Sequence, residues 1–494
     1  MTFCAGNPSC DEKHPHDALR GLKGNACHNR ATPSFPASSV SDLSGVAHAL
    51  SVMKTPVKII KSVLLQFKGS TFARNSLTLS GGVAVAQALP LLFYPVLGRI
   101  FTAEEFGLLA AVSSITTVLS VLGSGKYENG ILVAPDKHEA AHLAVLSVLL
   151  GFVTMAASWL VLRYLLADSL VAWFQEQELT RWLFVCPVAA FFIIVYNVYN
   201  EWCVREKYFK ALSVNKIVNA GAIVLGKTFL GFVRLSSQGL VVGDLIGRAV
   251  SAVGCTIRAW HFDAGTFARV RLSGLKRSAV RFKEFPLYTM PGQLLNTIGQ
   301  ALPVLFIAHY FNKAEVGYFS MALSLFAIPI SIVGTAVRDV YRQRANEEFV
   351  TSGTCMASFN KVMKLLVVAG VGAFLVFEWF LPQLMALFLG RQWYVAGHYA
   401  QILAPAMVAM FVSTSMSGLF IVAGKLRQFF YWQVAYAVTT LLSVWLGGML
   451  FESMEALLIL FAATRFVVYL ASIVMTYRYA AGSGRTGRGI APSA

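Results

Sequence analysis

The sequence predicts an all-α protein that crosses a membrane many times, and its composition and its periodic apolar runs both support this class. The 494-residue chain is 56% hydrophobic and only 13% charged, whereas a soluble domain carries about 25% charged residues. From residue 78 onward, apolar runs of about the length that a bilayer requires follow one another. Twelve runs are expected to span the membrane: 78–98, 107–123, 140–165, 182–200, 213–233, 238–260, 285–311, 316–337, 362–381, 396–421, 429–450 and 454–477.

The distribution of Lys and Arg predicts the orientation of these spans. Basic residues concentrate in every second gap and in the C-terminal tail, whereas the other gaps hold few of them. Twelve crossings place both termini on one side of the membrane, and short basic loops stay in the cytoplasm. We therefore expect both termini of this inner or plasma membrane protein to be cytoplasmic.

The net charge of +17 does not predict a nucleic-acid-binding protein. The basic residues lie in loops beside the spans, where they set the topology and contact anionic membrane lipids. The seven cysteines show no paired spacing, so we expect no disulfide framework. No pattern in the sequence leads us to expect a cofactor.

The first 76 residues differ from the rest of the chain. Residues 1–52 are polar and rich in Pro, Ser, His and Gly, without the apolar core of a signal peptide, and we expect a disordered extension. Its Cys and His residues lack the close pairing of a structural zinc site. Residues 53–76 form a basic amphipathic lead-in that we expect at the membrane surface. We expect Met53 to be the native start.

An internal repeat divides the remaining chain into two halves. The segment GRIFTAEEFGLLAAVSS from Gly98 recurs as AHYFNKAEVGYFSMALS from Ala308, at an offset of 308 − 98 = 210 residues. The matched residues include Phe101 with Phe311, Glu105 with Glu315, Gly107 with Gly317 and Ser114 with Ser324. Two halves of six spans are parallel repeats, related by an axis along the membrane normal. The predicted parts are an N-terminal six-helix lobe (77–261), a cytoplasmic basic linker (262–284), a C-terminal six-helix lobe (285–479) and a cytoplasmic tail (480–494).

The loops between the spans argue against an enzyme. The longest non-cytoplasmic gap, at about 166–181, is too short for the folded domain that usually holds acid and base residues. We expect no nucleotide-binding, metalloprotease or serine-hydrolase site. Energy for any transport would then come from ions, from voltage or from the substrate gradient, unless a partner ATPase supplies it.

Polar residues on one predicted span indicate a cavity wall. In membrane proteins built from parallel repeats, spans that contain Gly and Pro border the binding cavity, and the first span of each half, at 78–98 and 285–311, has both. On the second of these spans, Gln293, Asn296 and Gln300 form a stripe at i, i+3 and i+7. We expect this stripe to line a cavity. The alternative is hydrogen bonding between packed helices.

Ionisable residues inside spans give a sharper signal, because each costs about 2.5–3.5 kcal/mol at mid-membrane. Asp244 and Arg248 lie at i, i+4 and can pair with each other, either beside the cavity or as a purely structural pair. Lys227 and Arg465 have no carboxylate at helical spacing in their own spans. We expect both to face the cavity rather than to extend to an interface.

Three further residues are weaker candidates. Arg99 and His309 lie near the outer ends of their spans, where we expect interface residues that could also line the mouth of the cavity. Glu128 follows a span beside Lys126, and we expect it to be solvated at the start of a cytoplasmic loop.

Five segments carry a family resemblance: GRIFTAEEFGLLAAVSS, KYENGILVAPDKHEAAHL, NEWCVREKYFKALS, SSQGLVVGDLIGR and FNKAEVGYFSMALSLFAIPISIVG. From about Phe72 to Tyr479 the chain resembles the Wzx-like polysaccharide (oligosaccharide) flippases of the multidrug/oligosaccharidyl-lipid/polysaccharide (MOP) exporter superfamily. The resemblance implies a MATE-like fold, with two lobes around a central cavity in the bacterial inner membrane. It also implies translocation of an undecaprenyl-pyrophosphate-linked oligosaccharide for O-antigen, capsule or exopolysaccharide. The family has no catalytic motif to carry over.

A lipid-linked oligosaccharide is then the expected substrate, and Lys227, Arg248 and Arg465 would attract its anionic pyrophosphate. A polysaccharide polymerase and a chain-length regulator are the expected protein partners. Three alternatives remain open: a cation-coupled multidrug (MATE-type) exporter, a membrane-embedded enzyme of polysaccharide assembly, and a peptidoglycan-precursor flippase. The first would need unpaired carboxylates, and only Asp244 is available. Short outer loops disfavour the second, and the third usually has additional C-terminal spans.

Overall fold

The structure is a computed structural model that describes residues 71–166, 181–233 and 236–482. The described residues belong to one compact unit. Every element within the described residues is helical, which confirms the predicted all-α class. The predictions for residues 1–52, for 53–70 of the lead-in and for the tail beyond 482 lie outside the described residues.

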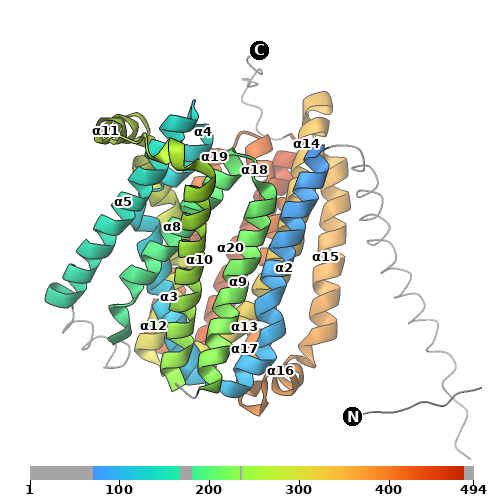
Figure 1. Ribbon diagram of the computed structural model, residues 1–494. Coiled ribbons are helices and arrows are strands. Elements are labelled where there is room, and N and C mark those ends of the chain that lie inside the picture. Colours follow the sequence, from blue (N-terminus) through green and yellow to red (C-terminus); the bar gives the residue numbers. More distant parts are fainter. Residues whose placement is uncertain (1–70, 167–180, 234–235, 483–494) are drawn as a thin grey trace, which may run out of the picture. The chain divides into compact units, whose positions relative to one another are not determined.

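The helices that begin before the predicted linker form what we call the N-terminal set (Figure 1), and the last of them extends into the linker as far as Phe267. They are α2 (Thr71–Ile100), α3 (Ala103–Gly123), α4 (Gly130–Val133), α5 (Lys137–Val161), α8 (Cys186–Arg205), α9 (Phe209–Phe232) and α10 (Ser236–Phe267). A 3₁₀ turn, η1 (Tyr127–Asn129), precedes α4, and a short helix, α11 (Leu272–Arg281), lies within the predicted linker.

The helices after the linker form the C-terminal set. They are α12 (Met290–Tyr310), α13 (Lys313–Pro329), α14 (Thr335–Ser352), α15 (Met356–Glu378), α16 (Leu381–Leu389), α17 (Tyr394–Met416), α18 (Leu419–Val422), α19 (Leu426–Leu450) and α20 (Met454–Ala480). A π-helical turn, η3 (Phe285–Thr289), leads into α12, and another, η4 (Ile330–Gly334), joins α13 to α14 without a break. A 3₁₀ turn, η5 (Arg391–Trp393), precedes α17.

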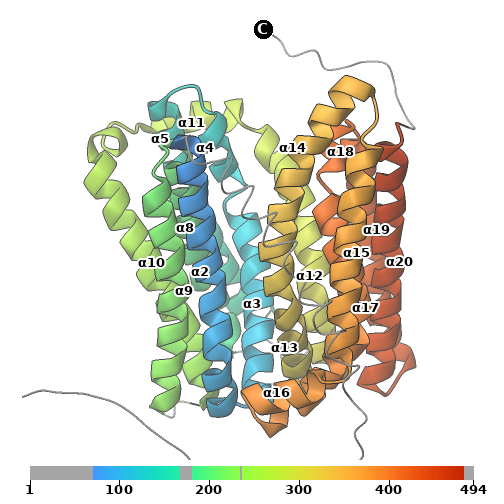
Figure 2. The same ribbon diagram turned by 90° about the vertical axis from the view of Figure 1, so that its right-hand side faces the viewer.

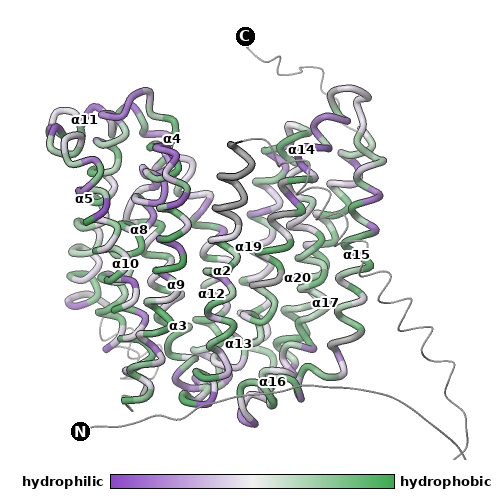
Figure 3. Tube along the Cα trace, turned by 45° about the vertical axis from the view of Figure 1, so that its right-hand side comes forward, coloured by the Kyte–Doolittle hydropathy of each residue, from purple (hydrophilic) through white to green (hydrophobic). Residues whose placement is uncertain are grey.

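Each of the twelve predicted runs overlaps one of the long helices, although 316–337 continues from α13 through η4 into α14, and 396–421 includes α18 as well as α17. Within the described residues, ten helices are long and apolar enough to cross a membrane, and Figure 3 shows that their apolar residues dominate the bundle. The other two predicted spans, α9 and α12, have 24 and 21 residues but are more polar. The polar residues that lower their hydropathy include Lys227 on α9 and the Gln293–Gln300 stripe on α12. Candidate site residues therefore contribute to the low hydropathy of these two helices, together with Asn215, Lys216 and Asn219 of α9.

The internal repeat gives both sets the same helix start. At the N-terminus of α3, the hydroxyl of Thr102 accepts a hydrogen bond from the Glu105 N–H at 3.3 Å. At the N-terminus of α13, the Asn312 side chain accepts from the Glu315 N–H at 2.9 Å. Both side chains satisfy backbone donors that a first helical turn leaves free. The matched sequence segments thus begin matched helices.

The two sets are hydrogen-bonded to each other at the end of the unit that carries α16. Helices α4, α11, α14 and α18 lie at one end and α16 at the other (Figures 1 and 2). At the α16 end, Trp393 Nε1 donates to the Gly98 carbonyl of α2 at 2.8 Å, and Gln392 Nε2 donates to the same oxygen at 2.6 Å. These bonds join the C-terminal set to the N-terminal set. By the predicted topology, the α16 end is the outer one.

Candidate functional site

Lys227, Asp244 and Arg248 form an ion-pair network between α9 and α10. Asp244 Oδ1 lies 2.8 Å from Lys227 Nζ, and Asp244 Oδ2 lies 2.5 Å from Arg248 Nε. The three side chains are 13%, 12% and 22% exposed, in chain order. Because two cations share one carboxylate, the network carries one excess positive charge.

Glycines bring α9 and α10 close enough for this network. A Cβ placed at Gly226 would lie 2.8 Å from the Gly243 carbonyl oxygen, and one at Gly243 would lie 2.6 Å from the backbone nitrogen of Lys227. Such close backbone contact through small residues is typical of helices packed within membranes. It lets Lys227 reach Asp244 on the neighbouring helix. The sequence search for carboxylates within one span missed this partner.

Arg465 is buried in the C-terminal set and is held by aromatic side chains. It is 5% exposed, and its Nη2 donates to the Tyr436 hydroxyl at 2.5 Å. The guanidinium carbon lies 4.5 Å from the Phe461 ring centroid and 5.2 Å from that of Tyr436, which are distances typical of cation–π contacts. Its Nε has no hydrogen-bond partner. Among the described residues, no carboxylate forms an ion pair with this cation.

Arg248 and Arg465 occupy corresponding places in the last helix of each set. Arg248 follows the first residue of α10 by 248 − 236 = 12 positions, and Arg465 follows that of α20 by 465 − 454 = 11. Asp244 stands four positions before Arg248, and Phe461 stands four positions before Arg465. An ion pair thus holds the arginine of the N-terminal set, and aromatic rings hold that of the C-terminal set.

The polar stripe of α12 is exposed along its whole length. Gln293, Asn296 and Gln300 are all exposed, and α12 packs against α3 of the N-terminal set and α19 of the C-terminal set. The Gln300 amide nitrogen makes two long contacts of 3.4 Å, to the backbone and side-chain oxygens of Asn296. That the stripe lines a cavity remains a proposal.

Arg99 and His309, the weaker candidates for the mouth of the cavity, lie at the C-terminal ends of their helices. Arg99 is exposed near the end of α2, and its Nη2 donates to the Leu387 carbonyl of α16 at 3.2 Å. His309 is half-buried near the end of α12, with its ring 4.9 Å from that of Tyr310. No hydrogen bond or ion pair in the described part of the chain joins Arg99 or His309 to the Lys227–Asp244–Arg248 network or to Arg465.

The prediction that Glu128 is solvated is wrong. Glu128 is 3% exposed and pairs with Lys126 Nζ at 3.2 Å, and both side chains are buried. The break after α3 turns the chain inward, because Gly125 and Lys126 have positive φ angles of 56° and 58°. The glycines on either side of this segment were the sequence signal for such a turn.

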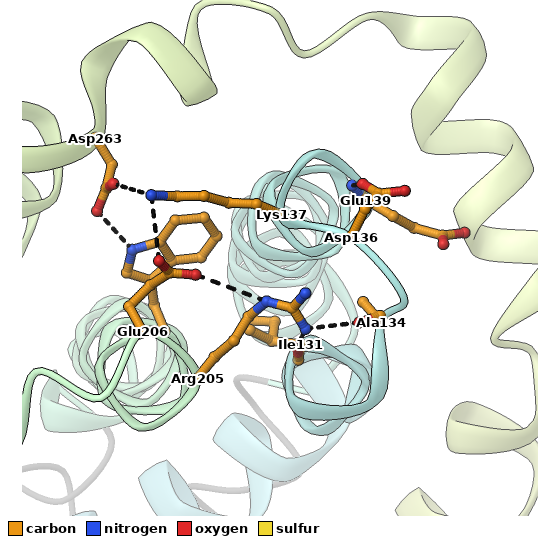
Figure 4. A network of polar contacts seen from close by, with 9 residues as sticks. Ile131, Ala134, Asp136, Lys137, Glu139, Arg205, Glu206 and Asp263 are labelled. Atoms are coloured by element: carbon orange, nitrogen blue, oxygen red, sulfur yellow. Dashed lines mark hydrogen bonds and ion pairs between the residues drawn. The ribbon is translucent and has the colours of Figure 1, made fainter.

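A second polar network ties together the helix ends beside α11 (Figure 4). Lys137 Nζ lies 2.6 Å from Asp263 Oδ1 and 3.2 Å from Glu206 Oε2. Trp202 Nε1 donates to the other Asp263 oxygen at 2.9 Å, and Arg205 Nη1 donates to the Ile131 and Ala134 carbonyls. Asp263 interrupts α10 with non-helical angles (φ −133°, ψ 21°). Sequence reasoning used only Lys137 and Arg205 of this network, as basic loop residues that indicate the topology.

Two segments match the letter patterns of catalytic motifs, and the structure gives both another role. Residues 221–228, GAIVLGKT, match the P-loop pattern but lie inside helix α9 instead of the loop that would cradle phosphates. Residues 138–142, HEAAH, match the zinc-protease pattern. There Glu139 pairs with Arg281 at 3.0 Å, and His142 Nδ1 lies 2.7 Å from the His138 carbonyl oxygen. No cluster of metal-ligating side chains occurs in the described part of the chain.

The fold is that of MOP-superfamily transporters. The lipid II flippase MurJ, in an inward closed conformation, matches with a TM-score of 0.63 at 9% identity, over 83% of this chain and 90% of its own. A MOP transporter from Pyrococcus furiosus matches with 0.57 at 14% identity, over 85% and 98%. An outward-facing MATE-family multidrug resistance transporter matches with 0.57 at 15% identity, over 86% and 99%.

The sequence itself assigns the family. A family profile described as "Polysaccharide biosynthesis protein" matches residues 96–398, which is 303 of the 494 residues. The chain therefore belongs to this family of polysaccharide biosynthesis proteins and has the MOP-transporter fold, with ten helices in its described part that are long and apolar enough to cross a membrane. No curated protein sequence matches it.

Proposed function

We propose that the chain is a flippase that moves undecaprenyl-diphosphate-linked oligosaccharides across the cytoplasmic membrane for O-antigen, capsule or exopolysaccharide synthesis. The observation that carries the proposal is Arg465, a buried cation without a carboxylate partner among the described residues. The polysaccharide biosynthesis family and the flippase-like fold supply the context. The protein would act without catalysis, and a polymerase and a chain-length regulator would use its product.

The electrostatics suit a diphosphate. Each phosphate of a sugar–diphosphate–lipid carries one negative charge at neutral pH, and charge-assisted hydrogen bonds to arginine are strong where water is scarce. Arg465 offers one positive charge, and the Lys227–Asp244–Arg248 network offers one in excess of its carboxylate. The prenyl tail can stay in lipid while the polar head crosses. Positive charge in the interior therefore supports an anionic lipid-linked substrate.

The nearest alternative is a cation-coupled multidrug exporter, because MATE-family transporters share the fold. Such an exporter would need an interior carboxylate that is free to bind a cation or a proton. Asp244 contacts two cations, at 2.8 and 2.5 Å, and is thus already neutralised. This pairing favours the flippase.

The proposal is tested by replacing Arg465 and measuring export of the glycan in cells that depend on the plasmid-borne protein. Arg465→Ala should reduce surface glycan at least about tenfold at unchanged protein level, because a buried charge-assisted bond contributes about 1.5–3 kcal/mol. Arg465→Lys should retain partial activity, because the charge remains but the planar fork is lost.

A matched control separates the buried site from arginine–tyrosine contacts in general. Arg427 also bonds a tyrosine hydroxyl, that of Tyr431 at 3.0 Å, and lies over its ring, but it is exposed. Arg427→Ala should leave export unchanged. Normal export by Arg465→Ala, or equal loss in both variants, would count against an anion site at Arg465.

A further inference from the structure

We propose that Gln293, Asn296 and Gln300 on α12, which we call the amide stripe, bind the sugar hydroxyls of the transported lipid. The inference rests on the proposed function and deepens it, because it names the surface that reads the glycan. The cations described above would hold the diphosphate. The two parts of the substrate would then be recognised by different residues.

The amide stripe is exposed on a helix that packs on two sides. Helix α12 contacts α3 of the N-terminal set and α19 of the C-terminal set, and Figures 2 and 3 both draw it between these groups of helices. Buried Gly299 lies about 100° around the helix axis from Gln300, and all three amides are exposed. The helices that pack against α12 therefore leave the stripe uncovered, at the junction of the two sets.

The amides have few partners within the protein. The two 3.4 Å contacts from Gln300 to Asn296 are the only hydrogen bonds of these side chains in the described part of the chain. Each amide offers two donors and one acceptor oxygen, and such groups are costly to leave unsatisfied among lipid tails. The stripe is therefore placed to meet water or a polar ligand.

Uncharged amides suit sugars better than phosphates. A sugar hydroxyl both donates and accepts hydrogen bonds, and an amide presents both functions on neighbouring atoms. The stripe has no cation, whereas phosphate recognition relies on positive charge. Asn296 and Gln300 stand about one helical turn apart, which is about 5.4 Å along the axis. Two hydroxyls of one sugar can thus be bound together.

The helix that carries the stripe also contacts the group around Arg465. A Cβ placed at Gly299, on the buried side of α12, would lie 3.3 Å from Cε1 of Tyr436, and the Tyr436 hydroxyl accepts from Arg465. One helix therefore presents exposed amides and, through its buried Gly299, contacts the arginine's aromatic partner. A diphosphate drawn toward Arg465 would bring its first sugars to α12.

The test compares two probes on the full-length protein in detergent, with the midpoint of thermal unfolding as the measure of binding. One probe is undecaprenyl diphosphate, and the other is the lipid-diphosphate saccharide fraction extracted from cells that naturally express the chain. Wild-type protein should bind the saccharide probe about two- to tenfold more tightly for each amide engaged. The triple variant Gln293→Leu, Asn296→Leu, Gln300→Leu should lose this gain and keep its affinity for undecaprenyl diphosphate.

The matched control is Thr297→Val, which removes a polar group beside the stripe. The Thr297 hydroxyl already donates to the Gln293 carbonyl at 2.9 Å, so this variant should keep the saccharide gain. A triple variant that keeps the gain, or a wild type that shows none, overturns the inference while the proposed function stands. A wild type that binds neither probe overturns the proposed function and this inference with it.

A second readout tests where the stripe faces. Asn296→Cys should react with a membrane-impermeant thiol reagent, and the saccharide probe should slow that reaction more than undecaprenyl diphosphate does. Equal protection by both probes, or an unreactive thiol in the folded protein, overturns the assignment of this surface to the sugars.

Discussion

Gly107 and Gly317 meet each other's helices in a reciprocal contact. A Cβ at Gly107 would collide with the carbonyl oxygen of Lys313, and a Cβ at Gly317 would collide with that of Ala103. Lys313 and Gly317 follow Ala103 and Gly107 by the same 210 positions, since 313 − 103 = 317 − 107 = 210. The repeated segment of the sequence thus packs against its own copy, where α3 of one set contacts α13 of the other.

This contact should not tolerate a methyl group. Gly107→Ala and Gly317→Ala should each destabilise the protein by about 1–3 kcal/mol or more, because the obstruction is rigid backbone. Thermal unfolding in detergent measures the effect. The control is Gly254→Ala on α10, where nothing lies within 4 Å of the added carbon, and where we expect unchanged or slightly higher stability. Equal behaviour of the three variants would contradict the close packing.

The Lys227–Asp244–Arg248 network should respond strongly to loss of its carboxylate. Asp244→Asn leaves two buried cations uncompensated, and breaking a buried ion pair in this way costs about 3–5 kcal/mol. The triple variant Lys227→Met, Asp244→Leu, Arg248→Met should recover most of that stability, because it removes every charge of the network. The midpoints of thermal unfolding of the two variants measure this difference in stability. A triple variant that is no more stable than Asp244→Asn would disprove the prediction.

The network around Asp263 should hold the helix ends beside α11 in place. Lys137→Met removes the cation between Asp263 and Glu206, so two carboxylates remain close together without compensation. We expect a lower unfolding midpoint and faster proteolysis at the α4–α5 connection. Lys276→Met provides the comparison, because Lys276 is exposed on α11, and it should change neither quantity.

Cys355 should react with alkylating reagents only at high pH. Burial raises the pKa of this thiol above its ordinary value of 9.0, and the side chain lies beside the Tyr341 hydroxyl, 4.0 Å away. Since the thiolate is the reactive form, the native protein should be alkylated slowly at pH 8 and faster as the pH rises beyond 9. Peptide mass spectrometry measures the extent at each pH. Rapid alkylation at pH 8 without denaturant would refute the buried position.

The predicted topology is open to a direct test. Reporter fusions after Arg271, Arg344 and Arg427 should report the cytoplasm, and fusions near Lys313 and Glu452 should report the outside, because basic loops stay cytoplasmic. An external position for the 262–284 segment would reverse the orientation and place the α11 end outside.

The sequence supports the helices and the Asp244–Arg248 pair, because each depends on spacing within one segment. It supports the repeat because two segments can be aligned residue by residue. It could not reveal the Lys227–Asp244 contact, because a pairing between helices depends on which of them pack together and how closely their glycines allow. The aromatic surroundings of Arg465 were hidden for the same reason, since Tyr436 comes from a different helix. Glu128 was misplaced because a polar stretch after a span was taken for a solvated loop, although its glycines turn it into the interior.

The reciprocal glycine contact is the kind of interface that two identical subunits form about a twofold axis. In a dimer of identical chains, every substitution occurs in both subunits. The two copies of an arginine therefore keep the same neighbouring residue. Joining the copies through 262–284 removes that constraint. The chain accordingly keeps the symmetric contact at Gly107 and Gly317 but has a carboxylate beside one arginine and a phenyl ring beside the other. One chain can therefore place two chemically different sites in its two similar halves.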